Sequence, residues 1–338
     1  MLSESNTETY RISLPSKGRL AEDCLEFLAA SGLRIYKPNP RQYEAVIPAL
    51  PDLRVLFQRA TDIVTSVMDG SVDFGITGLD VVAELQGKGQ EIILLHEALG
   101  FGGCSLNLAI PETWDNVWAV SDLKAYAGKL NRPLRVATKY QNLASKFFEK
   151  QGITTQLIAN EGTLEIAPAI GYADMICDVV SSGVTLRDNR LRMLEGGKIL
   201  DSQAVLIANA ATLRQKPEAL RIARILIEYF EAHLQASDKL AVFANMRGDS
   251  PESIAQLIFD NTTIAGLQGP TISPVIVRND TRQWFAVNII VSRSQLYQSI
   301  NELRAIGGSG VVVLPVTYIF DEEPPRYTRL IQNLQSIP

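Results

Sequence analysis

A short run of acidic, hydroxyl-bearing and glycine residues near the middle of the chain has the composition of a sugar-phosphate site. The apolar stretch Ala173–Val180 is typical of a buried strand, and it carries Asp174 and Asp178. The strand leads into Ser181-Ser182-Gly183-Val184-Thr185, where a helix would begin. Backbone N–H groups in such a turn bind anions, and the hydroxyls can donate further hydrogen bonds to phosphate oxygens. Asp178 would accept hydrogen bonds from the sugar hydroxyls; on spacing alone, an ordinary capped turn is the alternative.

Two similar α/β segments make up the region around this run. Both show the order strand, polar or basic turn, helix, strand: residues 11–14, 17–19, 20–31 and 72–78 in the first copy, and residues 134–138, 139–142, 143–151 and 173–180 in the second. Asn142 is a candidate N-cap for the helix of the second copy. The repeated order predicts two α/β lobes facing across a cleft, with chance resemblance of βα units as the alternative.

The last hundred residues follow a different order. We expect strands at 240–246, 271–277, 284–291 and 311–320. We also expect two helices, of which the first starts at Ser250-Pro251 and the second ends at Gly307-Gly308. A polar turn, Asn279-Asp280, lies between the second and third strands. The resulting β-α-β-β-α-β order is the ferredoxin-like plan. After Phe320 we expect a polar tail without a role.

Composition narrows the classes of function. The 338 residues carry 32 basic and 37 acidic side chains, so the formal charge is −5, which disfavours general binding to nucleic acid or to an anionic membrane. No stretch approaches the ~18 apolar residues of a spanning helix, and residues 1–9 lack a signal peptide's pattern, so we expect a cytoplasmic protein. The three cysteines and two histidines show no metal-ligand spacing, and we assign no metal ligands.

The phosphate-turn run resembles the phosphoribosyl pyrophosphate (PRPP) site of the ATP phosphoribosyltransferase family, which begins histidine biosynthesis. Six further segments, in the family's order, resemble its signatures: Leu14–Leu20, Gln58–Ile63, Asp73–Asp80, Ala137–Leu143, Glu161–Pro168 and Leu206–Asn209. Six ordered matches are far more specific than any one of them. Thr61, Gln141 and Val184 depart from the family pattern. We expect Val184 to alter the phosphate turn modestly, because its side chain disfavours a positive φ.

The resemblance implies an α/β fold of three parts. Two lobes would be of the periplasmic-binding-protein type II kind, and a C-terminal ferredoxin-like (βαββαβ, ACT-like) domain would mark the family's long, regulated form. The division we expect is lobe I at residues 1–103, with residues 195–236 returning to it, lobe II at 104–194, the regulatory domain at 237–322 and a tail at 323–338.

The implied reaction joins ATP and PRPP. N1 of adenine attacks the anomeric carbon, pyrophosphate leaves, and N1-(5-phosphoribosyl)-ATP forms through an oxocarbenium-like transition state. The protein need not supply a nucleophile, so none is assigned. It must orient two polyanions and stabilise the leaving charge. Mg²⁺ is the implied cofactor, held mainly by the substrate phosphates.

The resemblance also assigns binding residues. PRPP would be bound by Asp174, Asp178, Ser181, Ser182, Gly183, Val184, Thr185 and Glu161. ATP and pyrophosphate would be bound by Lys17, Gly18, Arg19, Arg59, Thr77, Gly78, Asp80, Lys139 and Tyr140. For Arg59, a solvated surface charge is the alternative.

For regulation, the resemblance implies a homo-oligomer, dimer to hexamer, that histidine inhibits. The loop Gly269–Pro274 resembles the family's histidine-binding segment, with Thr271 and Ser273 as the binding residues. A strand-entry turn that packs against a neighbour is the alternative for this loop. For the whole chain, the alternative is a non-catalytic solute-binding or regulatory protein of the same fold. The phosphate turn and the absence of an export signal argue against that alternative.

Overall fold

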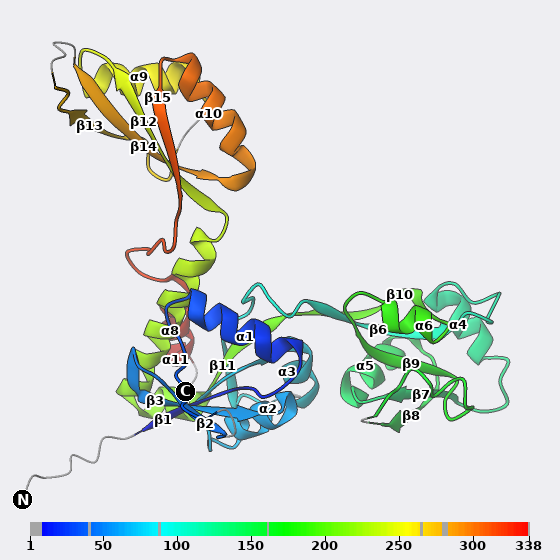
Figure 1. Ribbon diagram of the computed structural model, residues 1–338. Helices are drawn as coiled ribbons and strands as arrows, with labels where there is room; N and C mark the ends of the chain where they lie inside the picture. The colour runs from blue at the N-terminus through cyan, green and yellow to red at the C-terminus, as the bar shows by residue number, and fades with distance from the viewer. Residues whose placement is uncertain are drawn as a thin grey trace, which may run out of the picture. The chain divides into compact units, whose positions relative to one another are not determined.

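The computed structural model (Figure 1) describes residues 9–39, 42–86, 89–160, 162–263, 266–278 and 283–336. The chain forms two compact units. Residues 1–227 and 325–338 form unit 1, and residues 228–324 form unit 2. Unit 1 contains two lobes, each built on its own sheet, and unit 2 contains a third sheet.

Lobe I of unit 1 is drawn in blue in Figure 1. Its sheet has the order β2 (Glu44–Ile47), β3 (Leu50–Gln58), β1 (Tyr10–Pro15), β4 (Phe74–Gly78), β11 (Ala204–Asn209) and β5 (Ile92–His96). Its first helices are α1 (Arg19–Ala30), α2 (Ala60–Met68) and α3 (Leu79–Leu85). Strand β1 runs parallel to β3 and β4, so the three strands end at the same edge of the sheet. Every position of β4 is buried, as its apolar sequence predicts.

Lobe II carries the predicted second copy. Its sheet has the order β10 (Leu191–Ser202), β6 (Cys104–Pro111), β9 (Met175–Val180), β7 (Leu134–Thr138) and β8 (Thr155–Ala159). Its helices are α4 (Val120–Ala127), α5 (Gln141–Gln151) and α6 (Val184–Asp188). Strand β9 is parallel to β7 and antiparallel to β6, and Phe148 of α5 is buried in the core beside this sheet.

The two lobes share one strand order, apart from the extra edge strand β2. The order β3-β1-β4-β11-β5 of lobe I corresponds to the order β8-β7-β9-β6-β10 of lobe II. In both orders the fourth strand arrives from the other lobe. Strand β6 is the arriving strand of lobe II, and β11 is that of lobe I. The predicted repeat is therefore confirmed, and the lobes are of the periplasmic-binding-protein type II kind. The predicted residue limits of the lobes stay a prediction.

Unit 2 has the predicted βαββαβ order. The elements are β12 (Lys239–Arg247), α9 (Pro251–Asn261), β13 (Thr271–Val275), β14 (Trp284–Ser292), a 3-10 turn at Arg293–Gln295, α10 (Leu296–Ala305) and β15 (Ser309–Pro315). The strands form one antiparallel sheet in the order β13-β14-β12-β15. Helix α9 starts where predicted, and Ser250 caps it, since its Oγ accepts from the N–H of Ser253 at 3.2 Å. The predicted turn Asn279-Asp280 lies outside the described residues.

Two further helices follow β11. Asn209 caps α7 (Ala210–Gln215), because its Oδ1 accepts from the N–H of Thr212 at 2.8 Å. The second is α8 (Pro217–Ala236), along which the chain passes from unit 1 into unit 2. Within the described ranges, no helix has the length and apolar character that crossing a membrane requires.

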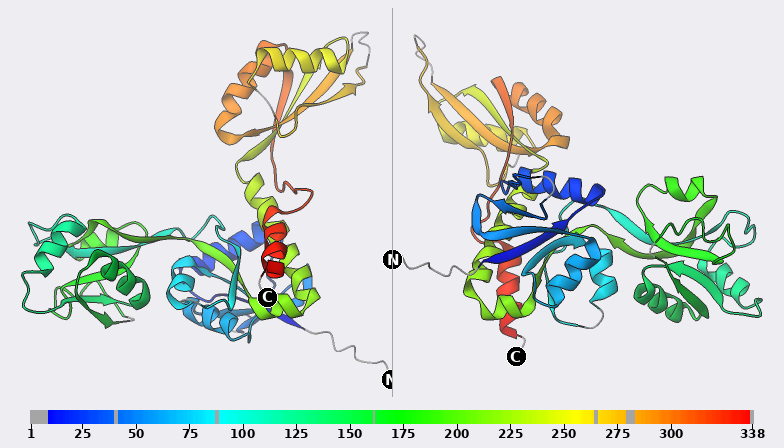
Figure 2. Two further views of the ribbon diagram at one scale, coloured as in Figure 1. Left: turned by 180° about the vertical axis from the view of Figure 1, so that it is seen from behind. Right: turned by 60° about the horizontal axis from the view of Figure 1, so that its bottom comes forward.

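The segment predicted to be a tail is a helix of unit 1, α11 (Pro325–Ser336), shown in red in Figure 2. Leu330 is buried, the guanidinium of Arg326 donates to the Glu97 carboxylate at 2.9 Å, and the Arg224 guanidinium lies 5.3 Å from the ring centre of Tyr327. The prediction was wrong because it considered how few apolar residues the segment has and not the spacing between them. Residues 327, 330, 331 and 334 recur at helical spacing.

Deleting residues 325–338 is expected to lower the midpoint of thermal unfolding of unit 1 by about 3 °C or more, since burying one Leu side chain stabilises by about 1.5–3 kcal/mol. Differential scanning calorimetry of the full and shortened chains measures this. Arg329→Ala is the matched control, because the Arg329 side chain is 60% exposed and lies 3.8 Å from Glu97. An unchanged midpoint in the shortened chain would contradict a structural role for α11.

Candidate functional site

A pocket of about 600 Å³ is lined by residues of both lobes of unit 1. The lining residues that carry charge, hydroxyl or thiol groups are Lys17, Arg19, Arg59, Thr61, Asp80, Glu84, Cys104, Lys139, Tyr140 and Ser181. Most of them follow the carboxyl ends of strands. In an open α/β sheet this edge is where ligands bind, because the turns that follow parallel strands meet there.

Lobe I contributes cations to this pocket. Lys17 follows β1, Arg19 begins α1, and Arg59 is the N-cap residue of α2 directly after β3. The three side chains come together because Pro15 and Gln58, the last residues of parallel strands, are register partners. All three residues are exposed to solvent. Gly18 precedes α1 with φ of 76°, a conformation that disfavours any side chain, and this turn sets the direction in which α1 starts.

Lobe II contributes Lys139 to the pocket lining, and Asp178 lies beside this lysine. Strands β7 and β9 are parallel, with Thr138 opposite Cys177, so the next residue of each strand reaches the same edge. The Lys139 Nζ lies 3.8 Å from the Asp178 Oδ1. Burial raises the pKa of Asp178 above its ordinary value, although the charge of Lys139 acts in the opposite direction. The site therefore holds a half-buried carboxylate beside one ammonium group.

The predicted phosphate turn follows Asp178 and Val179. Ser181 lines the pocket, and the side chains of Ser181, Ser182 and Thr185 are exposed. Gly183 is the N-cap residue of α6 with φ of 71°, and Val184 is the first helical residue. The expectation that Val184 disturbs the turn was therefore wrong, because the positive φ falls on the glycine before it.

Asp80 and Tyr140 line the pocket, but they bind each other across the lobes. The Tyr140 Oη donates to the Asp80 Oδ2 at 2.5 Å, and the Ser202 Oγ donates to the Asp80 Oδ1 at 2.7 Å. Burial, and then the charge of Asp80, raise the pKa of Tyr140, so the phenol stays protonated. Both residues were predicted to contact ATP. Here their polar ends form a buried link between the lobes.

Thr77 and Asn142 also differ from expectation. Thr77 is fully buried and its Oγ1 donates to the Ala60 carbonyl, so within the described residues it lies outside the pocket lining, whereas Gly78 belongs to it. Asn142 is not the N-cap of α5, because the helix already begins at Gln141. Its backbone N–H donates instead to the Glu84 carboxylate of lobe I at 2.8 Å.

Asp174 is a correction to the predicted PRPP site. It precedes β9 at the end of the strand opposite Asp178 and the phosphate turn, and four residues of extended chain span about 13 Å. Its carboxylate accepts from Arg132 at 2.5 and 2.8 Å and from the side chain of Arg135 at 2.9 Å. Partial burial acts to raise the pKa of Asp174, but these hydrogen bonds outweigh it and hold that pKa well below its ordinary value. Asp174 therefore stabilises lobe II.

Replacing Asp174 with asparagine is expected to lower the midpoint of thermal unfolding by about 3–6 °C at pH 7, with the half-exposed Arg132 limiting the effect. A depressed carboxyl pKa stabilises the fold above the unfolded pKa of about 4, and this contribution is lost as the pH falls through the folded value. The difference between wild type and variant should therefore shrink below about pH 4. Thermal unfolding followed by circular dichroism at several pH values measures it, and equal midpoints at pH 7 would contradict it.

Sequence reasoning missed three residues near this pocket. Glu84 and Cys104 line it, and Ser202 supports Asp80. Glu84 had a detectable signal, since it lies four residues after Asp80 on one helix and therefore on the same face. Burial raises the pKa of Cys104, so its thiol is not a ready nucleophile. The predicted Glu161 lies outside the described residues.

The predicted regulatory residues lie in unit 2. Thr271 and Ser273 are exposed on the edge strand β13, opposite Asn288 and Ala286 of β14. The Asn288 Oδ1 is buried and has no hydrogen-bond partner among the described residues. Directly paired residues share a face of the sheet, so Thr271 and Asn288 lie on one face.

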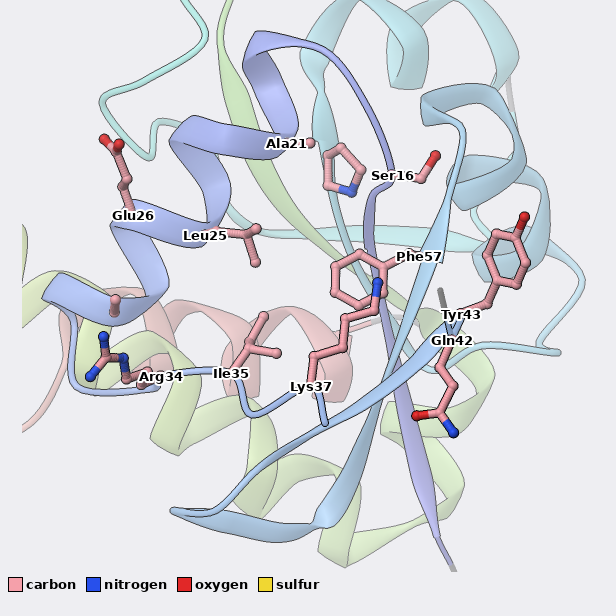
Figure 3. Close-up of a pocket in the computed structure, with 12 residues that line it drawn as sticks. Ser16, Ala21, Leu25, Glu26, Arg34, Ile35, Lys37, Gln42, Tyr43 and Phe57 are labelled. Carbon is pink, nitrogen blue, oxygen red and sulfur yellow. The ribbon is translucent and has the colours of Figure 1, made fainter. Parts of the chain in front are cut away.

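A larger hollow, of about 820 Å³, lies on lobe I and is shown in Figure 3. Leu25 and Glu26 of α1 line one side, and Gln42 and Tyr43 line another. The Lys37 Nζ lies 4.3 Å from the ring centre of Phe57, so this cation is engaged. The residues described as lining this hollow include none of those predicted for the site. The convergence of charge and hydroxyl groups therefore favours the smaller pocket.

Known proteins resemble this chain over most of its length. Residues 59–230 match the family model described as "ATP phosphoribosyltransferase", and residues 236–318 match that described as "HisG, C-terminal domain". The chain is 45% identical over 334 residues to "ATP phosphoribosyltransferase 2, chloroplastic" of Arabidopsis thaliana, covering 97% of this chain and 81% of that protein. It is 34% identical over 307 residues to the ATP phosphoribosyltransferase of Methanocaldococcus jannaschii, covering 91% and 98%.

A solved structure shares the fold. It is titled as the ATP phosphoribosyl transferase (HisG:HisZ) complex of Thermotoga maritima, and its TM-score to this chain is 0.52 at 24% identity. The similarity covers 66% of this chain and 99% of that one.

Proposed function

The chain belongs to the ATP phosphoribosyltransferase family, and we propose that the pocket between lobes I and II is its active site. The enzyme joins ATP to PRPP and releases pyrophosphate, the first step of histidine biosynthesis. The observation that carries the proposal is the convergence of Lys17, Arg19 and Arg59 from one lobe with Lys139 and the hydroxyl-rich turn from the other. In a chain with a net charge of −5, this is a local site for two polyanions.

PRPP is proposed to bind on lobe II. Its 5-phosphate would accept hydrogen bonds from backbone N–H groups and hydroxyls of residues 181–185, where Gly183 allows the tight turn. Its ribose hydroxyls would donate to Asp178. The support for this assignment is that the exposed hydroxyls and the half-buried carboxylate are three residues apart at the end of one strand.

ATP and the leaving pyrophosphate are proposed to meet the cations. N1 of adenine attacks the anomeric carbon, and the electron pair of the breaking C–O bond leaves with pyrophosphate. The nucleophile comes from ATP, so the side chains orient the reactants and neutralise developing charge. Lys139 is placed for this task because it lines the same pocket as the lobe I cations and its Nζ lies 3.8 Å from Asp178. Asp80 and Tyr140 would shape the pocket rather than bind charge.

Mg²⁺ is the metal we propose. When bound, it would neutralise charge on the pyrophosphate group. In the described ranges no group of three or more His, Cys, Asp or Glu side chains could hold a metal ion. We propose that substrate phosphates carry most of the cation's ligands and that Asp178, three residues before the phosphate turn, is a carboxylate that would help to hold it.

The test of the proposed reaction mixes ATP, PRPP and Mg²⁺ with the enzyme and follows the absorbance of phosphoribosyl-ATP. The expected result is product that depends on both substrates, with pyrophosphate formed in equal amount. Binding of either substrate without turnover at high enzyme concentration would instead identify a solute-binding or regulatory protein.

Histidine is the inhibitor we propose, bound on unit 2 at Thr271 and Ser273. The support is the Asn288 Oδ1 beside Thr271, which has no hydrogen-bond partner in the described part of the chain and could accept one from an ammonium or imidazole N–H. The measurement is a histidine titration of the assay above. Full activity at saturating histidine would contradict the proposal.

A homo-oligomer, dimer to hexamer, is also proposed for this chain. The support is the match of residues 236–318 to the family's C-terminal domain, which is the part that marks the family's regulated form. Light scattering coupled to gel filtration, with and without histidine, measures the assembly. A monomer under all conditions would contradict it.

A further inference from the structure

Helix α3 of lobe I directs two carboxylates at lobe II. Asp80 and Glu84 lie one helical turn apart, and both are almost fully buried. Asp80 accepts from the Tyr140 phenol, as described above. Glu84 accepts from two backbone N–H groups of α5, those of Asn142 at 2.8 Å and Leu143 at 2.9 Å. The Asn142 side chain completes the contact by donating to the Glu84 backbone carbonyl at 3.0 Å.

These contacts cap α5 from the opposite lobe. Asn142 and Leu143 are the second and third residues of the helix, whose N–H groups have no partner inside it. Among the described residues, the N-cap residue Tyr140 makes no side-chain bond to them. Other helices are capped locally: Asn209 caps α7, Ser250 caps α9, and Asp122 serves α4. A carboxylate at a helix N-terminus is also favoured by the helix dipole.

The residues just before α5 belong to the proposed active site. Lys139 and Tyr140 connect β7 to α5, and the Lys139 Nζ lies 3.8 Å from Asp178. Fixing the first turn of α5 therefore fixes the loop that presents Lys139. Separating the lobes would break the Glu84 bonds and uncap α5 at the same time, so closure of the pocket and order in this loop are coupled.

We propose that Glu84 is a positioning residue that holds the two lobes closed and Lys139 in place by capping α5 from lobe I. The inference rests on the proposed function of the inter-lobe pocket. Substrates bind the closed arrangement, so part of their binding energy must close a variant that is mostly open. The apparent affinity of that variant for substrate is then the intrinsic affinity multiplied by the fraction of molecules that are closed. Saturating substrate restores closure, so turnover at saturation changes little.

The experiment compares Glu84→Ala and Glu84→Gln with a matched control, Asp122→Ala. Asp122 is a carboxylate that accepts from backbone N–H groups at the start of a lobe II helix, but from within lobe II. For Glu84→Ala we expect KM for ATP and for PRPP to rise about tenfold with kcat within about twofold of wild type. Glu84→Gln keeps one carbonyl acceptor, so its KM values should lie between those of wild type and those of Glu84→Ala. Asp122→Ala should keep both KM values.

A second readout does not depend on activity. Hydrogen–deuterium exchange of a peptide covering residues 139–147 should be faster in Glu84→Ala than in wild type, and unchanged in Asp122→Ala. If Glu84→Ala does not fold, Glu84→Gln decides. KM values within twofold of wild type, or unchanged exchange in this peptide, would overturn the proposal. If wild type forms no PRPP-dependent product, the proposed function fails, and the exchange experiment still judges the cap.

Discussion

Replacing Asp178 with alanine is expected to lower kcat/KM for PRPP by about 10²–10⁴-fold, because two hydroxyl hydrogen bonds to a charged acceptor contribute about 1.5–3 kcal/mol each. The carboxyl group of Asp178 lies beside Lys139 in a site where burial raises its pKa, so charging it costs more here than in water. Steady-state kinetics with PRPP varied at saturating ATP measures the effect.

The matched control for this variant is Asp174→Asn, on the same β9 segment. Asp174 pairs with Arg132 and Arg135 at the other end of the strand, so this variant should lose stability and keep kcat/KM. The comparison also tests the corrected assignment of Asp174. Equal losses of kcat/KM in the two variants would return Asp174 to the PRPP site, and unchanged kinetics in Asp178→Ala would remove Asp178 from it.

Replacing Lys139 with methionine, which keeps the length of the side chain, is expected to lower kcat by about 10²-fold, the usual cost of losing one group that stabilises transition-state charge. The pH profile should change as well. The charge of Lys139 lowers the pKa of Asp178 against the opposing effect of burial, so without it that pKa rises further. If the charged carboxylate is needed, the acid limb of kcat/KM moves to higher pH.

Rates between about pH 5 and pH 9 measure this shift. Lys146→Met is the control, since Lys146 is exposed on α5, the helix that follows Lys139. An acid limb at the same pH in wild type and Lys139→Met would show that the pair of Lys139 and Asp178 does not govern activity.

The local parts of the site could be predicted from the sequence. The strand that ends near Asp178, the turn at residues 181–185 and the basic residues after β1 and β3 depend on short-range patterns. A strand, its turn and the next helix are specified by alternation, by glycine and by hydroxyl residues within about ten positions. For the same reason the βαββαβ order of unit 2 was predicted correctly.

Predictions that depended on residue neighbourhood in sequence were less reliable. Asp174 and Asp178 are four residues apart, yet an extended strand places them at opposite ends, with different partners. Asn142 had the right residue type for an N-cap, but the helix begins at Gln141, two residues before the predicted start, and its cap comes from Glu84. The C-terminal segment looked polar by composition, although its spacing was helical.

The sequence by itself therefore determined which residues carry charge and hydroxyl groups, which strands are buried, and where the glycine- and hydroxyl-rich turn lies, because hydrophobic period and backbone freedom act over short distances. Only the tertiary structure decided how the lobes are joined. The Asp80–Tyr140 bond joins residues that are 60 positions apart in the sequence, and the bond from Asn142 to Glu84 joins residues that are 58 apart. The contact of α11 with lobe I joins residues that are more than 200 positions apart. Such contacts depend on how whole sheets and helices pack, and no local pattern encodes that packing.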